Sequence, residues 1–168
     1  MINWMYYPTN RTPDDVSKKV IEAFQLIAEN VDSAKYQYES NHVLSEVSPL
    51  LAKEGFITEK SKKAADKIHV PVSYGLNGKV LVAFDADAYK KESGYVIEVE
   101  AGRAVTNYQF LKDFYEACMM NDVNYCCIAV RNTYRSSDDF EKVKRFFDAM
   151  YSSNRIAVPL DGLLIIGY

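Results

Sequence analysis

Phe84-Asp85-Ala86-Asp87-Ala88-Tyr89 and Tyr95-Val96-Ile97-Glu98-Val99-Glu100 are the stretches that decide the fold of this chain. Each contains a β-prone run with two acidic residues at or near its end. The segment between them, Lys90-Lys91-Glu92-Ser93-Gly94, is polar and ends in glycine, which is typical of a hairpin connection. The pattern therefore predicts two neighbouring strands whose acidic ends lie close together.

Strand geometry predicts which of these acids share a face. Side chains two apart on a strand point to the same side, so Glu98 pairs with Glu100 and Asp85 pairs with Asp87. Up to four carboxylates would then converge at one end of a sheet. Such a cluster repels itself and holds protons unless a cation compensates it. The alternative interpretation is a solvated strand end that carries two acidic pairs and no site.

The chemistry of these donors favours a hard divalent cation. All of them are oxygen ligands, which suit Mg²⁺, with Mn²⁺ as a substitute. Zinc is not expected, because the only histidines are His42 and His69 and no Cys/His cluster has zinc spacing. The sequence thus predicts Mg²⁺ as the cofactor if the acids form a site.

Composition sets the class of protein. The chain has 168 residues, 48% of them hydrophobic and 26% charged, which suits one domain over residues 1–168. The formal net charge of -3 gives no overall basic footprint, so a nucleic acid would need a local basic patch or metal ions. The three cysteines indicate buried thiols in a reducing compartment. We expect a cytoplasmic protein with no signal peptide and no membrane partner.

Hydrophobic periodicity predicts an α/β (α+β) fold with a central mixed five-stranded sheet, antiparallel at its start and flanked by helices. Thr12 is the expected N-cap of the first helix, and Pro49 is expected to kink the second or to leave it with a short first segment. The expected helices cover residues 12–29, 40–54, 103–121 and 137–151, and the expected strands cover 56–58, 68–74, 79–87, 95–99, 124–130 and 163–166.

Two of these helices carry more apolar surface than one sheet contact requires. They are the helices over residues 103–121 and 137–151, both rich in aromatic side chains. A helix with apolar stripes on more than one side is covered on more than one side. We therefore expect a homodimer that buries part of one of these two helices.

The order of elements and several short motifs resemble the PD-(D/E)xK restriction-endonuclease superfamily, most closely its BglII and BamHI branch. The resemblance covers residues 40–168 and rests on the helix motif Asn41-His42-Val43-Leu44-Ser45-Glu46, the two acidic strand ends, and the stretches 101–104, 107–113 and 129–132. It implies a Mg²⁺-dependent endonuclease that hydrolyses phosphodiester bonds of double-stranded DNA as a homodimer.

The resemblance also implies roles for single residues. Asp87 matches the first metal-binding acid, with Asp85 as its rival, and Glu98 matches the second. Glu46 matches a helix glutamate that some members add to the metal site. Glu100 stands where most members have lysine. It cannot supply the positive charge of that lysine, but it can act as a general base or complete a second metal site.

Contacts to nucleic acid are expected from basic and polar residues near the acids. The densest positive stretch contains Lys60, Lys62, Lys63 and Lys67, and it is the first candidate for phosphate contacts. Arg103 and Asn107 follow the acidic motif, and an arginine there can bind a phosphate through two hydrogen bonds. Because Glu100 replaces the usual lysine, a catalytically inactive nuclease fold that binds DNA or a protein remains the alternative function.

Overall fold

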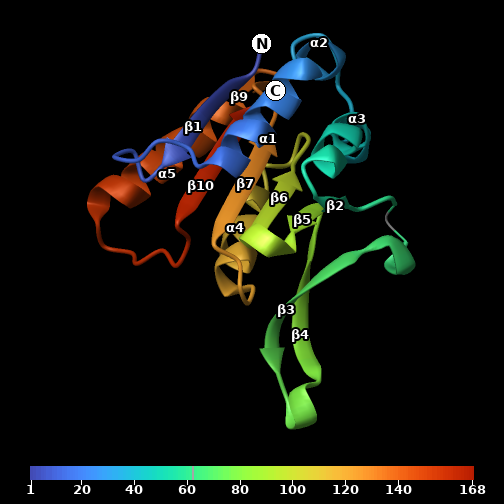
Figure 1. Ribbon diagram of the computed structural model, residues 1–168. Helices are drawn as coiled ribbons and strands as arrows, with labels where there is room; N and C mark the ends of the chain where they lie inside the picture. The colour runs from blue at the N-terminus through green and yellow to red at the C-terminus, as the bar shows by residue number, and fades with distance from the viewer. Residues whose placement is uncertain (62) are drawn as a thin grey trace.

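The computed structural model describes residues 1–61 and 63–168. Its body has three layers, with one sheet between two pairs of longer helices (Figure 1). The helices are α1 (Asp15–Leu26), α2 (Ala28–Val31), α3 (Ser40–Lys53), α4 (Gln109–Met119) and α5 (Asp139–Ser153). The strands are β1 (Asn3–Tyr7), β2 (Ile57–Thr58), β3 (Ile68–Tyr74), β4 (Val80–Ala86), β5 (Ala88–Lys90), β6 (Tyr95–Val99), β7 (Tyr125–Val130), β8 (Thr133–Tyr134), β9 (Ser137–Asp138) and β10 (Gly162–Gly167).

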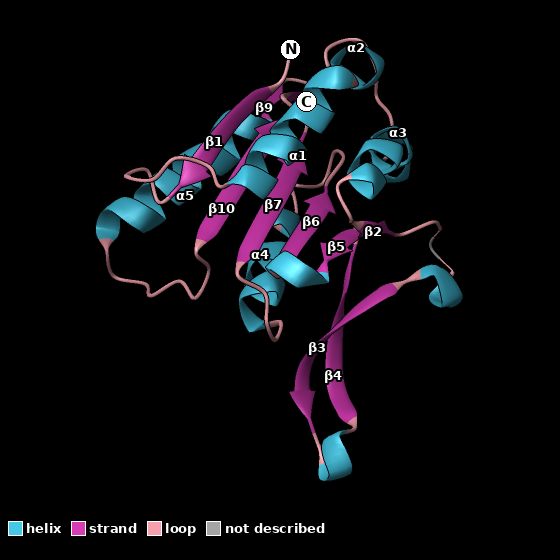
Figure 2. Ribbon diagram, in the orientation of Figure 1, coloured by secondary structure: helices cyan, strands magenta, loops and turns pink. Residues whose placement is uncertain are grey.

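The central sheet of the described chain has six strands in the order β1-β10-β7-β6-β5-β2. Its middle strands β6, β7 and β10 run parallel to one another, while β1, β5 and β2 pair antiparallel with their neighbours. The sheet is therefore mixed, with helices on both faces, as Figure 2 shows. The predicted α/β (α+β) class, with a mixed sheet flanked by helices, is confirmed.

Two hydrophobic cores lie on opposite faces of this sheet. One packs α1 and α3 against the strands and includes Ile97 and Cys127. The other packs α4 and α5 against the opposite face and includes Val96 and Cys126. Neighbouring residues of β6 and β7 thus point into different cores, as alternation along a strand requires. Both adjacent cysteines are buried thiols for this reason.

The β3–β4 hairpin forms a separate two-stranded sheet that extends away from the body (Figure 1). Only its base joins a core, through Ile68, Val70 and Ala86, while apolar side chains near its tip are exposed. The sequence predicts that strand 79–87 runs within the central sheet. Instead the chain leaves that sheet before Asp87, and only the short β5 continues beside β6.

Several element boundaries differ from the predictions. The predicted sheet lacks β1, so its strand number was wrong for the described chain. The first helix is capped by Asp14 rather than Thr12, because the Asp14 carboxylate accepts the backbone N–H of Ser17 at 2.9 Å. Helix α4 begins at Gln109 rather than residue 103, because residues 104–108 form turns.

The other elements follow the sequence more closely. Helix α3 has nearly the predicted bounds and is assigned continuously through Pro49. The polar segment before Gly94 forms the expected tight connection between β5 and β6. Among the described residues, no helix combines the length and the apolar character needed to cross a membrane.

Candidate functional site

The end of β6 places two acids on the face of the sheet that α4 covers. Ile97 and Val99 lie in the core beneath α1 and α3, so Glu98 between them faces the opposite side. Glu100 follows at the same parity, immediately after the strand. Its backbone is held by hydrogen bonds to the carbonyl of Ala129 and from the hydroxyl of Tyr168. The paired glutamates thus point toward α4, and both line one pocket.

Asp87 comes beside Glu98 through the register of two antiparallel strands. Ala88 pairs with Ile97, so one further step along the same register sets Asp87 opposite Glu98. The Asp87 carboxylate accepts the backbone N–H of Val99 at 2.8 Å, which fixes it against the end of β6. Residues opposite each other on antiparallel strands point to the same face. The short connection predicted from the sequence therefore brings Asp87 and Glu98 together.

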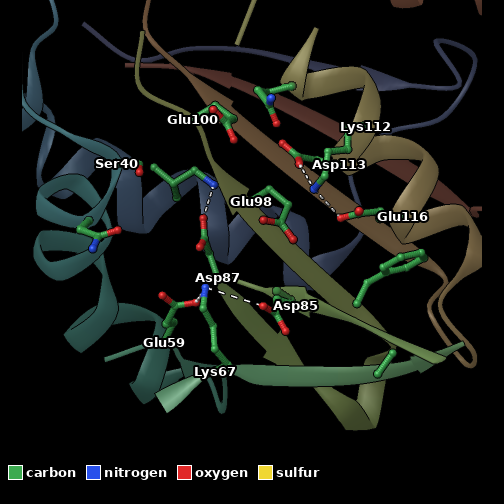
Figure 3. A pocket seen from close by; sticks show the side chains of 16 residues that line it. Ser40, Glu59, Lys67, Asp85, Asp87, Glu98, Glu100, Lys112, Asp113 and Glu116 are labelled. Carbon is green, nitrogen blue, oxygen red and sulfur yellow. Dashed lines mark hydrogen bonds and ion pairs between the residues drawn. The ribbon is translucent and has the colours of Figure 1, made fainter. Parts of the chain in front are cut away.

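Helix α4 adds an acid that the sequence analysis does not single out. Asp113 lies on the buried side of α4 with Phe110, Phe114 and Ala117, which pack in the core beneath this helix. Its side chain is 6% exposed, and its Oδ2 atom has no hydrogen-bond partner among the described residues. Asp113 thus faces Glu98 and Glu100 from the opposite wall of the pocket (Figure 3).

Burial and mutual repulsion shift the acid–base equilibria of this cluster. Burial, followed by the charges of Asp87, Asp113 and Glu100, raises the pKa of Glu98 well above its usual range. Burial, followed by the charge of Glu100, raises the pKa of Asp113 from 3.8 to about 8. The protein alone thus favours the protonated form of both groups, and a bound cation would compensate their charge in another way.

Two lysines line the pocket, Lys67 next to the β3–β4 hairpin and Lys112 on α4. Lys67 Nζ lies 2.9 Å from buried Glu59 and 3.8 Å from Asp85, whose other oxygen is 2.7 Å from His69 Nδ1. On the helix side, Lys112 Nζ lies 2.9 Å from Glu116 and 3.8 Å from Asp113. Asp85 is therefore engaged with the hairpin, whereas Asp87 is fixed against β6.

Together these groups form an acidic pocket of about 380 Å³ (Figure 3). Its described lining has more acidic than basic side chains, so its field favours cations. The acidic residues are Glu59, Asp85, Asp87, Glu98, Glu100, Asp113 and Glu116, and the basic residues are Lys67 and Lys112.

A second pocket of about 420 Å³ shares Ser40, Glu100 and Gln109 with the first. Arg103, which is exposed, and Glu39 also line it. Ser40 begins α3 and Gln109 begins α4, so the N-terminal ends of both helices meet here. Helix N-termini and a guanidinium favour anions. The acidic pocket thus continues into a region where one guanidinium and two helix N-termini lie beside the carboxylates of Glu39 and Glu100.

Other predicted residues lie away from the acidic pocket. Glu46 does not line it, and its carboxylate accepts a hydrogen bond from the Asn30 side chain at 2.9 Å. Lys60 and Lys63 are exposed, and Lys60 lines a small neighbouring pocket. Asn107 is exposed in the turns before α4. Lys62 lies outside the described residues.

Some pocket residues carry weak signals in the sequence. Asp113 is an acid three residues after Phe110 on a helix face that is otherwise apolar, which is a detectable anomaly. Glu59 directly follows the short strand β2, as Asp87 follows β4 and Glu100 follows β6. Lys67 is the last lysine of the basic stretch that begins at Lys60. Their convergence depends on the packing of α4 and β2 against β5 and β6, which no local pattern specifies.

The carboxylate oxygens are ligands of the type that a hard divalent ion prefers. They are not yet positioned to bind one ion together. Within residues 1–61 and 63–168, no three acidic, histidine or cysteine side chains stand where one ion could bind them together. An ion would have to draw in the Glu98 and Glu100 side chains, which rotate about several bonds. The oxygen donors and the unpartnered Asp113 Oδ2 nevertheless fit Mg²⁺ or Mn²⁺.

Comparisons with known proteins add one structural likeness. No family model matches the chain, and no curated protein matches its sequence. The fold is similar to the crystal structure of free BglII, with 9% sequence identity, a TM-score of 0.48, and coverage of 99% of this chain and 78% of that chain. At this identity and TM-score, the likeness assigns no residue or activity to this chain.

Proposed function

We propose that this protein is a Mg²⁺-dependent endonuclease that hydrolyses phosphodiester bonds of double-stranded DNA. The observation that carries the proposal is the convergence of Asp87, Glu98, Glu100 and Asp113 around one pocket that continues toward Arg103. Several carboxylate oxygens that line one pocket are the donors that a hard divalent cation prefers.

Asp87 and Glu98 are the residues that would hold the cation. Mg²⁺, when bound, supplies positive charge to the phosphate oxygens, on which negative charge builds during hydrolysis. Asp87 is already oriented by the backbone N–H of Val99, so little freedom is lost when it binds. Glu98 would give up the proton that its burial and its acidic neighbours favour, because a bound cation would replace that proton as the compensating charge.

Glu100 occupies the position at which it can accept a proton from an attacking water. It shares a face with Glu98 and lines both pockets, so it lies between the cation-binding acids and Arg103. Its carboxylate cannot neutralise charge as a lysine would. The positive charge on the substrate side would instead come from Arg103 and the two helix N-termini.

The test of this function is a plasmid-nicking assay with Mg²⁺, Mn²⁺ or EDTA, comparing the wild type with Glu98→Ala and Glu46→Gln. We expect cleavage by the wild type with either metal and none with EDTA. Glu98→Ala should lose at least about a thousandfold in rate, because it removes a ligand of the essential cation. Glu46→Gln should cleave like the wild type, since Glu46 lies outside the pocket.

Stability separates a catalytic role from a structural one. Glu98→Ala should keep or slightly raise the metal-free melting temperature, because it relieves repulsion with neighbouring acids. Mg²⁺ should raise the melting temperature of the wild type more than that of the variant. If Mg²⁺ stabilises neither protein and plasmid stays intact, the metal-nuclease proposal is wrong. A gel-shift that still shows DNA binding would then favour the non-cleaving module, in which Glu100 replaces the lysine.

A further inference from the structure

Asp113 is buried in a way that the protein itself does not explain. Its side chain is 6% exposed, and its Oδ2 atom has no hydrogen-bond partner in the described part of the chain. Buried carboxylate oxygens are normally satisfied, because leaving one without a partner forfeits its hydration. An aliphatic side chain at this position would pack with Phe110 and Phe114 without that cost. Asp113 therefore calls for a partner that is not a protein group.

The nearest ammonium does not supply that partner. Lys112 Nζ is 3.8 Å from Asp113 Oδ1, beyond hydrogen-bond distance, and it lies 2.9 Å from Glu116 instead. The Lys112 side chain is also 57% exposed to solvent. Asp113 lines the same pocket as Glu98 and Glu100, which face it from the sheet side. The wall across from the Asp113 carboxylate therefore carries further oxygen donors.

We propose that Asp113 is a further carboxylate ligand of the divalent cation, supplied by α4 opposite Asp87 and Glu98. This inference rests on the proposed metal-dependent function and extends its ligand set. The cation then lies between the end of β6 and α4, with ligands from both layers. It lies away from Asp85, which is engaged with His69 and Lys67, and away from Glu46.

Direct measurement of Mn²⁺ binding tests the proposal without DNA or catalysis. We would titrate Mn²⁺ into the wild type, Asp113→Asn and Glu46→Gln, following free Mn²⁺ by electron paramagnetic resonance. Asp113→Asn keeps the size of the side chain and removes its charge, and should weaken Mn²⁺ binding at least about tenfold. Glu46→Gln removes an equal charge from a helix residue that does not line the pocket. It should change the affinity less than about twofold, because a screened surface charge outside the pocket contributes little.

A change of ligand chemistry distinguishes coordination from a general electrostatic effect. Asp113→Cys places a soft thiolate donor at the site and should shift preference from Mn²⁺ toward Cd²⁺. Adding Cd²⁺ should then produce a thiolate-to-metal absorption band. The wild type is the baseline, because Cys118, Cys126 and Cys127 are present in both proteins.

The outcomes separate this inference from the proposed nuclease function. Wild-type Mn²⁺ affinity in folded Asp113→Asn, or no new band in folded Asp113→Cys, overturns the role of Asp113. A wild type that binds Mn²⁺ through Asp113 but leaves DNA intact supports this inference and contradicts the nuclease. A wild type that binds no Mn²⁺ overturns both. Should Asp113→Asn fail to fold, Asp113→Cys carries the test, because its side chain is smaller and can be buried as a thiol.

Discussion

At the scale of single residues, the carboxylates of the acidic pocket repel one another in the metal-free protein. Glu98 and Asp113 face each other, with Asp87 and Glu100 close to both, and burial adds to their repulsion. Lys112 and Glu116 are the other charged groups of α4 that face this cluster. A carboxyl group with a raised pKa binds a proton more tightly in the folded chain than in the unfolded chain. The stability of the metal-free protein must therefore depend on pH.

The sign of that dependence follows from the raised pKa of Asp113. Its stabilising contribution is complete below its ordinary pKa of 3.8 and is lost as the pH rises through about 8. In EDTA, we expect the free energy of unfolding to fall across this window, by at most about 1.4 kcal/mol per pH unit for one proton. Urea denaturation at several pH values measures it.

Asp113→Asn provides the control for this pH dependence. The variant should be more stable than the wild type near pH 8 and should show a shallower slope, with the remainder due to Glu98. Added Mg²⁺ should stabilise the wild type most at the higher pH, because the ligands are then deprotonated. Equal slopes for the two proteins would contradict the assignment of the slope to Asp113.

At the scale of elements, the tight connection between β5 and β6 sets the spacing of Asp87 and Glu98. Gly94 closes it with a φ of 60°, and its carbonyl accepts the backbone N–H groups of Asn124 and Tyr125. A Cβ atom at this position would lie 2.2 Å from the carbonyl oxygen of Asp122. The turn is therefore wedged against the start of β7, and no side chain fits there without backbone movement.

Replacing Gly94 should consequently destabilise the sheet that carries the site. We expect Gly94→Ala to lower the free energy of unfolding by at least about 2 kcal/mol, since it combines left-handed strain with a backbone clash. Gly78→Ala is the matched control, because Gly78 has a φ of 72° with nothing within 4 Å of an added Cβ. That change should cost about 1 kcal/mol from strain alone. Equal losses in urea denaturation would show that the clash at Gly94 relaxes freely.

Elements that a short-range sequence pattern determines were predictable. Elements whose position depends on packing between distant segments were not. Strand β6 and the turn at Gly94 follow from an apolar run bounded by polar residues and glycine. Strand β1 was missed because its partner β10 lies at the other end of the chain. The departure of β4 from the sheet also escaped prediction, since Val80 to Ala86 has the pattern of a sheet strand wherever it lies.

The candidate site divides in the same way. Asp87, Glu98 and Glu100 were predictable because strand parity and a short connection decide their faces. Asp113 was not, because its position depends on the docking of α4 across β6, and because turns replace the predicted first helical turns after residue 103. Glu46 does not line the pocket, and helical spacing gives its face but not the direction in which α3 packs.

At the scale of the whole molecule, the predicted homodimer has a candidate surface on α4 and α5. Tyr115 and Met119 on α4 are 45% and 49% exposed, and Phe146 on α5 is 38% exposed. Phe146 packs edge-on against Phe110 with ring centroids 5.4 Å apart, so the two helices share one aromatic surface. A rigid apolar face backed by a packed core is typical of a protein interface. Two copies related by a two-fold axis would also supply one site for each strand of a duplex.

The tip of the β3–β4 hairpin offers a competing apolar surface, where Leu81 is 69% exposed. We expect the dimer interface to be formed by α4 and α5. A two-stranded hairpin that extends from the body is a less rigid surface than two packed helices. Phe146→Glu should therefore weaken self-association by about 2 kcal/mol or more, roughly thirtyfold in Kd. Leu81→Glu should leave it unchanged.

Sedimentation equilibrium of the wild type and both variants at micromolar concentration measures this self-association. A monomeric wild type would refute the dimer. Dissociation by Leu81→Glu alone would show that the hairpin forms the interface.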